Sequence, residues 1–146
     1  IDDVKFFDGT GPDLELKAIL RPSSGCGLSA NDTVEIRVNN VGTVTQSNIP
    51  VAYKLNASAA VVGNIAGPLA GGSSATYKFP TTVNLSTPGA YQLLVYVGSA
   101  QDSDRTNDTL RTTLVSARNI TTLPDSEFFD NNNGVGGFIF GYLVFL

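Results

Sequence analysis

The sequence predicts an all-β protein, an Ig-like antiparallel β-sandwich of about seven strands with extra strand segments at both termini. Short runs in which apolar and polar residues alternate recur along the chain, as expected for strands with one buried face. Clusters of Gly, Pro, Asn, Asp and Ser separate these runs and favour tight turns. No stretch places apolar residues at the spacing of an amphipathic helix. Together these patterns favour strands joined by short turns.

The expected strands share an apolar residue at every second position. In chain order they cover residues 14–20, 34–38, 51–55, 60–65, 76–83, 91–97 and 110–116. Pro80 lies inside the fifth run and indicates an edge strand or a bulge, because proline cannot donate to a sheet ladder. The inward-facing side chains form the expected core: Leu14, Leu16, Val34, Ile36, Val38, Tyr53, Leu93, Val95 and Leu114.

Composition excludes most enzyme chemistries. The 146 residues include no histidine and one cysteine, Cys26, so Ser-His-Asp or Cys-His catalysis and histidine- or cysteine-bound zinc are ruled out. We expect Cys26 to be a small buried apolar residue. Glu15, Glu35 and Glu127 show no shared signature of a paired-carboxylate hydrolase. A net charge of −4 argues against nucleic-acid binding. The chain is therefore expected not to be an enzyme.

The flanks differ from the central block. The chain contains no methionine, so Ile1 is interpreted as an internal position of a longer protein. Residues 1–12 are interpreted as the end of a preceding domain and a linker, residues 13–117 as the sandwich, and residues 118–146 as a linker and the start of a following β domain. The stretch from Phe138 to Leu146 is apolar on both faces and too short for a membrane helix. We expect no membrane insertion, and we expect a neighbouring domain or another chain to cover this stretch.

Two acidic clusters are candidate Ca²⁺ sites, because Ca²⁺ prefers oxygen ligands. The first comprises Asp102, Asp104, Asn107 and Asp108, and the second comprises Asp130 and Asn132. Neither cluster has the EF-hand register, and Asp and Asn are also the usual residues of turns. Asp2 and Asp3 could join an ion site at a domain edge, although their spacing does not require it. Turn formation is the expected role, Ca²⁺ binding is the alternative, and no other cofactor is implied.

Several motifs carry a family resemblance. Asp13-Leu-Glu-Leu, Pro22-Ser-Ser-Gly-Cys-Gly-Leu28 and Thr33-Val-Glu-Ile-Arg-Val-Asn-Asn-Val-Gly42 resemble a bacterial CARDB module, a cell-adhesion-related, immunoglobulin-like domain. Residues 47–53, 71–77 and 104–109 fit the same pattern in the same order. The resemblance covers residues 13–117 and implies a sandwich that serves as a module of a larger protein.

The flanking motifs resemble a second type of domain. Ile1-Asp-Asp-Val4 is similar to the last strand of a MAM-type or lectin-like jelly roll. Leu123-Pro-Asp-Ser-Glu-Phe-Phe129 is similar to the opening of another, although Gly136-Gly-Phe138 replaces the usual Gly-Gly-Trp. Such alternation resembles large surface adhesins of Bacteroidota that type IX secretion exports, including gliding-motility adhesins. It implies an extracellular location at the cell surface.

Glycosylation is a further expectation. Asp32-Thr33-Val34 and Asp108-Thr109-Leu110 are similar to the O-glycosylation motif of exported Bacteroidota proteins, so Thr33 and Thr109 are the candidate acceptors. Asn-x-Ser/Thr sequences also occur, and these would be acceptors in a eukaryotic secreted protein. They begin at Asn31, Asn56, Asn84, Asn107 and Asn119.

The expected function is a non-catalytic structural or adhesive module, a stalk or spacer in cell adhesion or gliding. Its partners would be neighbouring domains of the same chain. One alternative is an ancillary domain of a secreted enzyme that binds surface glycans or protein through Tyr77, Tyr91 or Tyr96. Another is a subunit of an extracellular fibre that assembles with another chain through the terminal strand from Phe138 to Leu146.

Overall fold

The computed structural model describes residues 11–99 and 101–118, and this part of the chain forms eight β-strands and no helix. The predicted all-β sandwich is confirmed. The strands are β1 (Leu14–Arg21), β2 (Gly25–Cys26), β3 (Asp32–Asn40), β4 (Ile49–Leu55), β5 (Val61–Ile65), β6 (Ser74–Val83), β7 (Gly89–Val97) and β8 (Thr109–Ala117). Seven of them lie where alternation predicted a strand. The additional strand, β2, is only two residues long and therefore too short to show a period.

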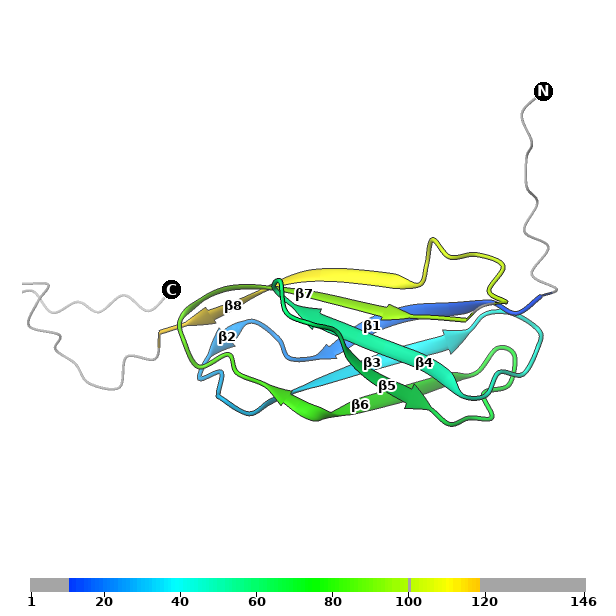
Figure 1. Ribbon diagram of the computed structural model, residues 1–146, viewed down its shortest axis with the longest axis horizontal. Helices are drawn as coiled ribbons and strands as arrows, with labels where there is room; N and C mark the ends of the chain where they lie inside the picture. Colours follow the sequence, from blue (N-terminus) through cyan, green and yellow to red (C-terminus); the bar gives the residue numbers. More distant parts are fainter. Residues whose placement is uncertain (1–10, 100, 119–146) are drawn as a thin grey trace, which may run out of the picture.

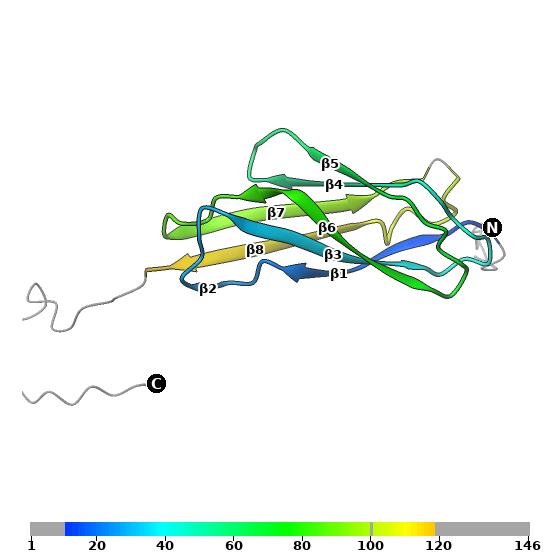
Figure 2. The same cartoon turned by 90° about the horizontal axis from the view of Figure 1, so that it is seen from below.

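The strands form two sheets that face each other (Figure 1). One sheet has the order β1-β3-β6, and the other has the order β2-β8-β7-β4-β5. All pairings are antiparallel except that of β2 with β8, which is parallel. The strands run along the long axis of the sandwich, and the described chain enters at one end of that axis and leaves at the other (Figures 1 and 2).

The core lies between the two sheets. All nine residues predicted from the alternation are buried, and most of the remaining buried positions lie on the same strand faces. Tyr53 and Phe79 pack edge to face with ring centroids 4.8 Å apart. Since each fully buried large apolar side chain contributes about 1.5–3 kcal/mol, this interior supplies the main stabilisation of the fold.

Pro80 behaves as predicted. Strand β6 is the edge of the three-stranded sheet and pairs only with β3. The pairing is irregular between Thr33 and Glu35, whose partners Thr82 and Lys78 flank Pro80. The missing N–H of Pro80 therefore falls where a sheet tolerates it, at an edge and a break in register.

The prediction that Cys26 is buried is wrong. Cys26 is exposed, because β2 is the edge strand of the five-stranded sheet and pairs with β8 only at Gly25 and Cys26. The apolar character of cysteine did not decide its position, because the loop between β1 and β3 runs over the surface there.

Several predictions lie outside the described residues. These are the strand segments at both termini, the ion-site residues Asp2, Asp3, Asp130 and Asn132, and the apolar stretch from Phe138 to Leu146. No helix long and apolar enough to cross a membrane occurs in residues 11–99 and 101–118.

Candidate functional site

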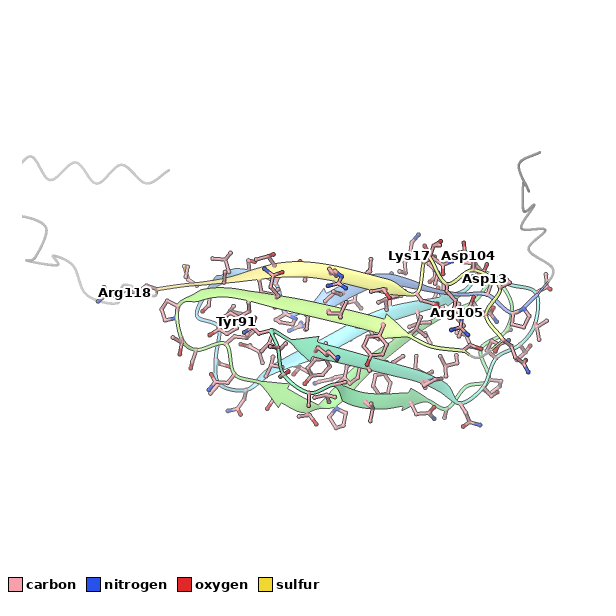
Figure 3. All side chains as sticks on the ribbon, turned by 45° about the horizontal axis from the view of Figure 1, so that its top comes forward. Asp13, Lys17, Tyr91, Asp104, Arg105 and Arg118 are labelled. Carbon is pink, nitrogen blue, oxygen red and sulfur yellow. The ribbon has the colours of Figure 1, made fainter. Side chains whose placement is uncertain are left out.

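The first predicted acidic cluster lies in the loop between β7 and β8, at the end of the sandwich where the described chain begins. Figure 3 shows Asp13, Asp104 and Arg105 gathered at this end. The Asp102 carboxylate accepts hydrogen bonds from the backbone N–H groups of Leu14 (2.9 Å) and Asp104 (3.0 Å). One Asp102 oxygen thus fixes the start of β1, and the other closes a turn.

Asp104 also forms a turn. Its Oδ1 atom accepts hydrogen bonds from the backbone N–H of Thr106 (3.0 Å) and from the Thr106 hydroxyl (2.6 Å). The hydrogen bonds from Thr106 lower the pKa of Asp104 below its usual value. Turn formation, the expected role of this cluster, accounts for one oxygen of Asp102 and for Oδ1 of Asp104, while the other oxygen of Asp102 holds the start of β1.

Asp108 is different, because it is a buried carboxylate with an unsatisfied oxygen. Only 8% of the residue is exposed, and its Oδ1 atom has no hydrogen-bond partner among the described residues. Burial raises the pKa of Asp108 to about 6, with Asp102, Asp13 and Asp104 adding repulsion that Arg105 partly offsets. Such a group is costly in the charged state unless a positive partner or a donor reaches it.

Asn107 adds a second buried oxygen without a partner. Its Oδ1 atom accepts no hydrogen bond from residues 11–99 or 101–118, whereas its Nδ2 atom donates to Asp13 Oδ1 over 3.1 Å. The backbone fixes both positions: the Asn107 carbonyl accepts the Leu16 N–H at 3.0 Å, and the Asp108 carbonyl accepts the Val97 N–H at 2.9 Å. Two consecutive acceptors are thus held in place next to β1 and β7.

Three or more acidic or cysteine side chains do not converge into a metal-holding group anywhere in the described residues. Any cation at this end would therefore need the Asn107 amide, backbone carbonyls or water in addition to carboxylates. The sequence suggested Asp102, Asp104 and Asp108 as ligands, but in the structure Asp102 and Asp104 form turns whereas Asp108 is buried.

The two candidate glycosylation residues lie at opposite ends of the sandwich. Thr109 is exposed at the start of β8, next to the acidic loop. Thr33 is partly buried near the start of β3 and lines a groove of about 570 Å³ together with Arg21, Asp32 and neighbouring loop residues. Thr109 is therefore the more accessible hydroxyl.

Two of the three candidate binding tyrosines have structural contacts. Tyr77 packs edge to face on Phe79, with ring centroids 4.9 Å apart, and the Tyr91 hydroxyl donates to the Thr87 carbonyl over 2.8 Å. Tyr96 instead lines a shallow, mainly apolar groove of about 290 Å³ on the outer face of the five-stranded sheet, together with Pro50 and Val62. Tyr96 is the tyrosine best placed to meet a ligand.

The carboxylates of Glu15 and Glu35 belong to surface pairs. Glu15 contacts Lys17 at 3.3 Å and Asn39 at 2.9 Å, and Glu35 lies 3.6 Å from Arg21. Glu127 is outside the described residues.

The model of the CARDB protein family matches residues 11–111, more than half of the chain. This chain belongs to the CARDB family. The match confirms the CARDB part of the predicted resemblance, and a CARDB domain is a module of larger proteins. The search of the curated proteins found no match.

Two solved structures of a CARDB domain have a fold similar to that of this chain. The NMR structure of the CARDB domain of PF1109 from Pyrococcus furiosus superposes with a TM-score of 0.58 at 16% identity, covering 74% of this chain and 97% of that one. The crystal structure of the same domain in complex with di-metal ions gives 0.52 at 15% identity, covering 75% and 96%. A β-glucosidase involved in saponin metabolism from intestinal bacteria gives 0.35 at 19% identity, covering 74% and 16%.

Proposed function

We propose that this CARDB domain is a non-catalytic spacer in a larger extracellular surface protein, where it projects binding domains from the cell. The observation that supports this function is the path of the chain. The described residues enter at one end of the long axis and leave at the other, with the strands between them aligned to that axis (Figure 1). A module of this shape adds its full length to a stalk.

The contacts that the β1–β2 segment makes with the last strand, β8, and with the loop before it suit a module under tension. Strand β2 runs parallel to β8. Pulling on the two ends of the chain slides parallel strands in opposite directions, so that their hydrogen bonds are loaded together rather than one after another. Two further bonds reinforce this seam: Leu16 N–H to the Asn107 carbonyl (3.0 Å) and Val115 N–H to Ser24 Oγ (2.9 Å).

The wider setting is also part of the proposal. The flanking motifs resemble jelly-roll domain edges of Bacteroidota adhesins, which supports export by type IX secretion and a role in adhesion or gliding motility at the cell surface. Neighbouring domains of the same chain would be the first partners. O-glycans on Thr33 and Thr109 are proposed on the Asp-Thr-aliphatic motif, and the exposure of Thr109 favours that position.

Mass spectrometry of the parent polypeptide, purified from its source, tests the spacer function. We expect a parent of large mass with repeated sandwich peptides and with peptides on both sides of Ile1 and Leu146. Glycans would add mass to the peptides that contain Thr33 and Thr109. A parent that ends near Leu146 would contradict the stalk and favour assembly of a fibre through the terminal apolar stretch.

Ligand binding through the outer groove is a second candidate function, because the half-buried Tyr96 and the exposed Val62 both line that groove. It would fit an ancillary domain of a secreted enzyme that contacts glycans or protein. A glycan array probed with the full chain and with Tyr96→Ser tests it. Binding that Tyr96→Ser removes would support this candidate, and absence of binding by the parent chain would favour the spacer alone.

A further inference from the structure

The residues Asn107 and Asp108 present the least satisfied polar atoms at the acidic end of the sandwich. Both Oδ1 atoms are buried and lack a hydrogen-bond partner within the part of the chain that the structure describes. A buried carboxylate oxygen without a donor costs free energy in the folded protein, and native structures normally satisfy such atoms with a donor, a water or an ion.

We propose that Asn107 and Asp108 form the protein side of a calcium-binding site at this end of the sandwich, with backbone carbonyls and water completing the coordination. The site is independent of the proposed spacer function. Asp13 positions it, because the Asp13 carboxylate accepts a hydrogen bond from Asn107 Nδ2 at 3.1 Å. That bond fixes the amide orientation in which the oxygen of Asn107, and not its nitrogen, is left for a ligand.

The local charge favours a cation. Asp13, Asp102 and Asp104 all repel the charge of Asp108, and Arg105 is the cation that opposes them. Arg105 donates to the Ser99 carbonyl at 3.3 Å, so part of its guanidinium is held on the neighbouring loop. Three neighbouring carboxylates against one guanidinium leave a negative potential at the Asp108 carboxylate, and a bound divalent ion would neutralise it.

The donor types select calcium. An amide oxygen, a carboxylate oxygen, carbonyls and water are the ligands that Ca²⁺ accepts in flexible six- to eight-fold coordination. Zinc prefers nitrogen and sulfur, which this end of the chain does not offer. A site with only one or two direct carboxylates is expected to be weak, with a dissociation constant on the order of 10⁻⁴–10⁻³ M.

Thermal unfolding of the full chain with and without CaCl₂ tests the site. After EDTA treatment, addition of 5 mM CaCl₂ should raise Tm on the order of 5 °C, as expected for a ligand that is several times above its dissociation constant. NaCl at matched ionic strength should not reproduce this shift. In ¹⁵N-HSQC spectra, Ca²⁺ should move the amide signals of residues 105–108 and 13–16, and leave those around Thr33 unchanged.

Matched variants decide between a specific site and general screening. Asp108→Asn keeps the size of the side chain but removes its charge, and it should abolish the Ca²⁺-induced rise in Tm. Asp104→Asn removes the charge of another carboxylate in the same loop, one that is not a proposed ligand, and should keep most of the rise. If Asp108→Asn did not fold, Asn107→Ala should weaken Ca²⁺ binding about 10-fold in calorimetric titration. The proposal is overturned if the wild-type chain shows no rise at 20 mM CaCl₂, or if NaCl or Asp108→Asn gives the same rise.

Discussion

The ring of Tyr77 fills the space in front of Gly63, where a side chain would otherwise be. A Cβ atom on Gly63 would lie 2.5 Å from the Tyr77 hydroxyl oxygen and 2.6 Å from its Cε1 atom. Tyr77 belongs to β6 and Gly63 to β5, so this contact joins the edge strands of the two sheets. The Tyr77 hydroxyl also accepts the Asn64 N–H at 3.4 Å, which covers part of the β5 edge.

Gly63→Ala should therefore destabilise the domain by about 1–3 kcal/mol, because the added methyl group forces the Tyr77 ring away from Phe79. Urea denaturation measures this loss. Gly25→Ala is the matched control, since a Cβ at Gly25 meets nothing within 4 Å, and it should change stability by less than about 0.5 kcal/mol. Equal effects of the two substitutions would contradict the packing role of Tyr77.

The buried amide of Asn40 should be intolerant of a carboxylate. Its Nδ2 atom donates to the carbonyls of Val44 (2.8 Å) and Leu69 (2.9 Å), and the residue is fully buried. Asn40→Asp replaces the Nδ2 donor by a carboxylate oxygen that faces the two carbonyl oxygens. We therefore expect the free energy of unfolding, measured by chemical denaturation, to fall by about 2–4 kcal/mol. Asn64→Asp, whose side chain is exposed, should cost little. An Asn40→Asp protein as stable as the parent would show that the loop between β3 and β4 does not depend on this amide.

Val95 tests the core. This residue is fully buried on the central strand β7, and an unpaired buried charge together with lost packing costs an amount comparable with the total stability of an ordinary domain, about 5–15 kcal/mol. Val95→Asp should therefore leave the chain unfolded in circular dichroism at 25 °C. Val62→Asp places the same charge on a residue that is 74% exposed, and the protein should fold. If Val95→Asp melted at the temperature of the parent, the core assignment would be wrong.

The burial of Val95 could be predicted from the sequence, because side chains in a strand face the core at every second residue and neighbouring residues show this alternation. The same pattern identified the seven longer strands and placed Pro80 at an edge. It could not predict β2 or the exposure of Cys26, since a two-residue parallel pairing depends on where β8 passes.

The candidate site was predictable only in part. Asp102, Asp104 and Asp108 have the same side chain, and only the fold shows that the first two close turns while the third is buried. Asp13 is far from Asn107 in the sequence, so no pattern among neighbouring residues predicts the hydrogen bond between them. The cluster of Asp and Asn residues before β8 indicated the correct loop, but it did not show which of these residues form turns and which is buried.

The seam between the β1–β2 segment and the last strand, β8, leads to a mechanical prediction. Ser24 Oγ accepts the Val115 N–H at 2.9 Å, which reinforces the parallel β2–β8 pair. Ser24→Ala removes this acceptor and should cost only about 0.5–1.5 kcal/mol at equilibrium. When the full chain is pulled by its ends in optical tweezers, however, the seam is the first contact loaded, so the unfolding force should fall clearly. Ser23→Ala, an exposed neighbour, should leave the force unchanged. The seam is loaded only when the two ends of the chain are pulled apart. The same variants pulled across the β4–β5 hairpin should therefore unfold at equal force. A difference in force there would mean that Ser24 acts through general stability and not through the seam.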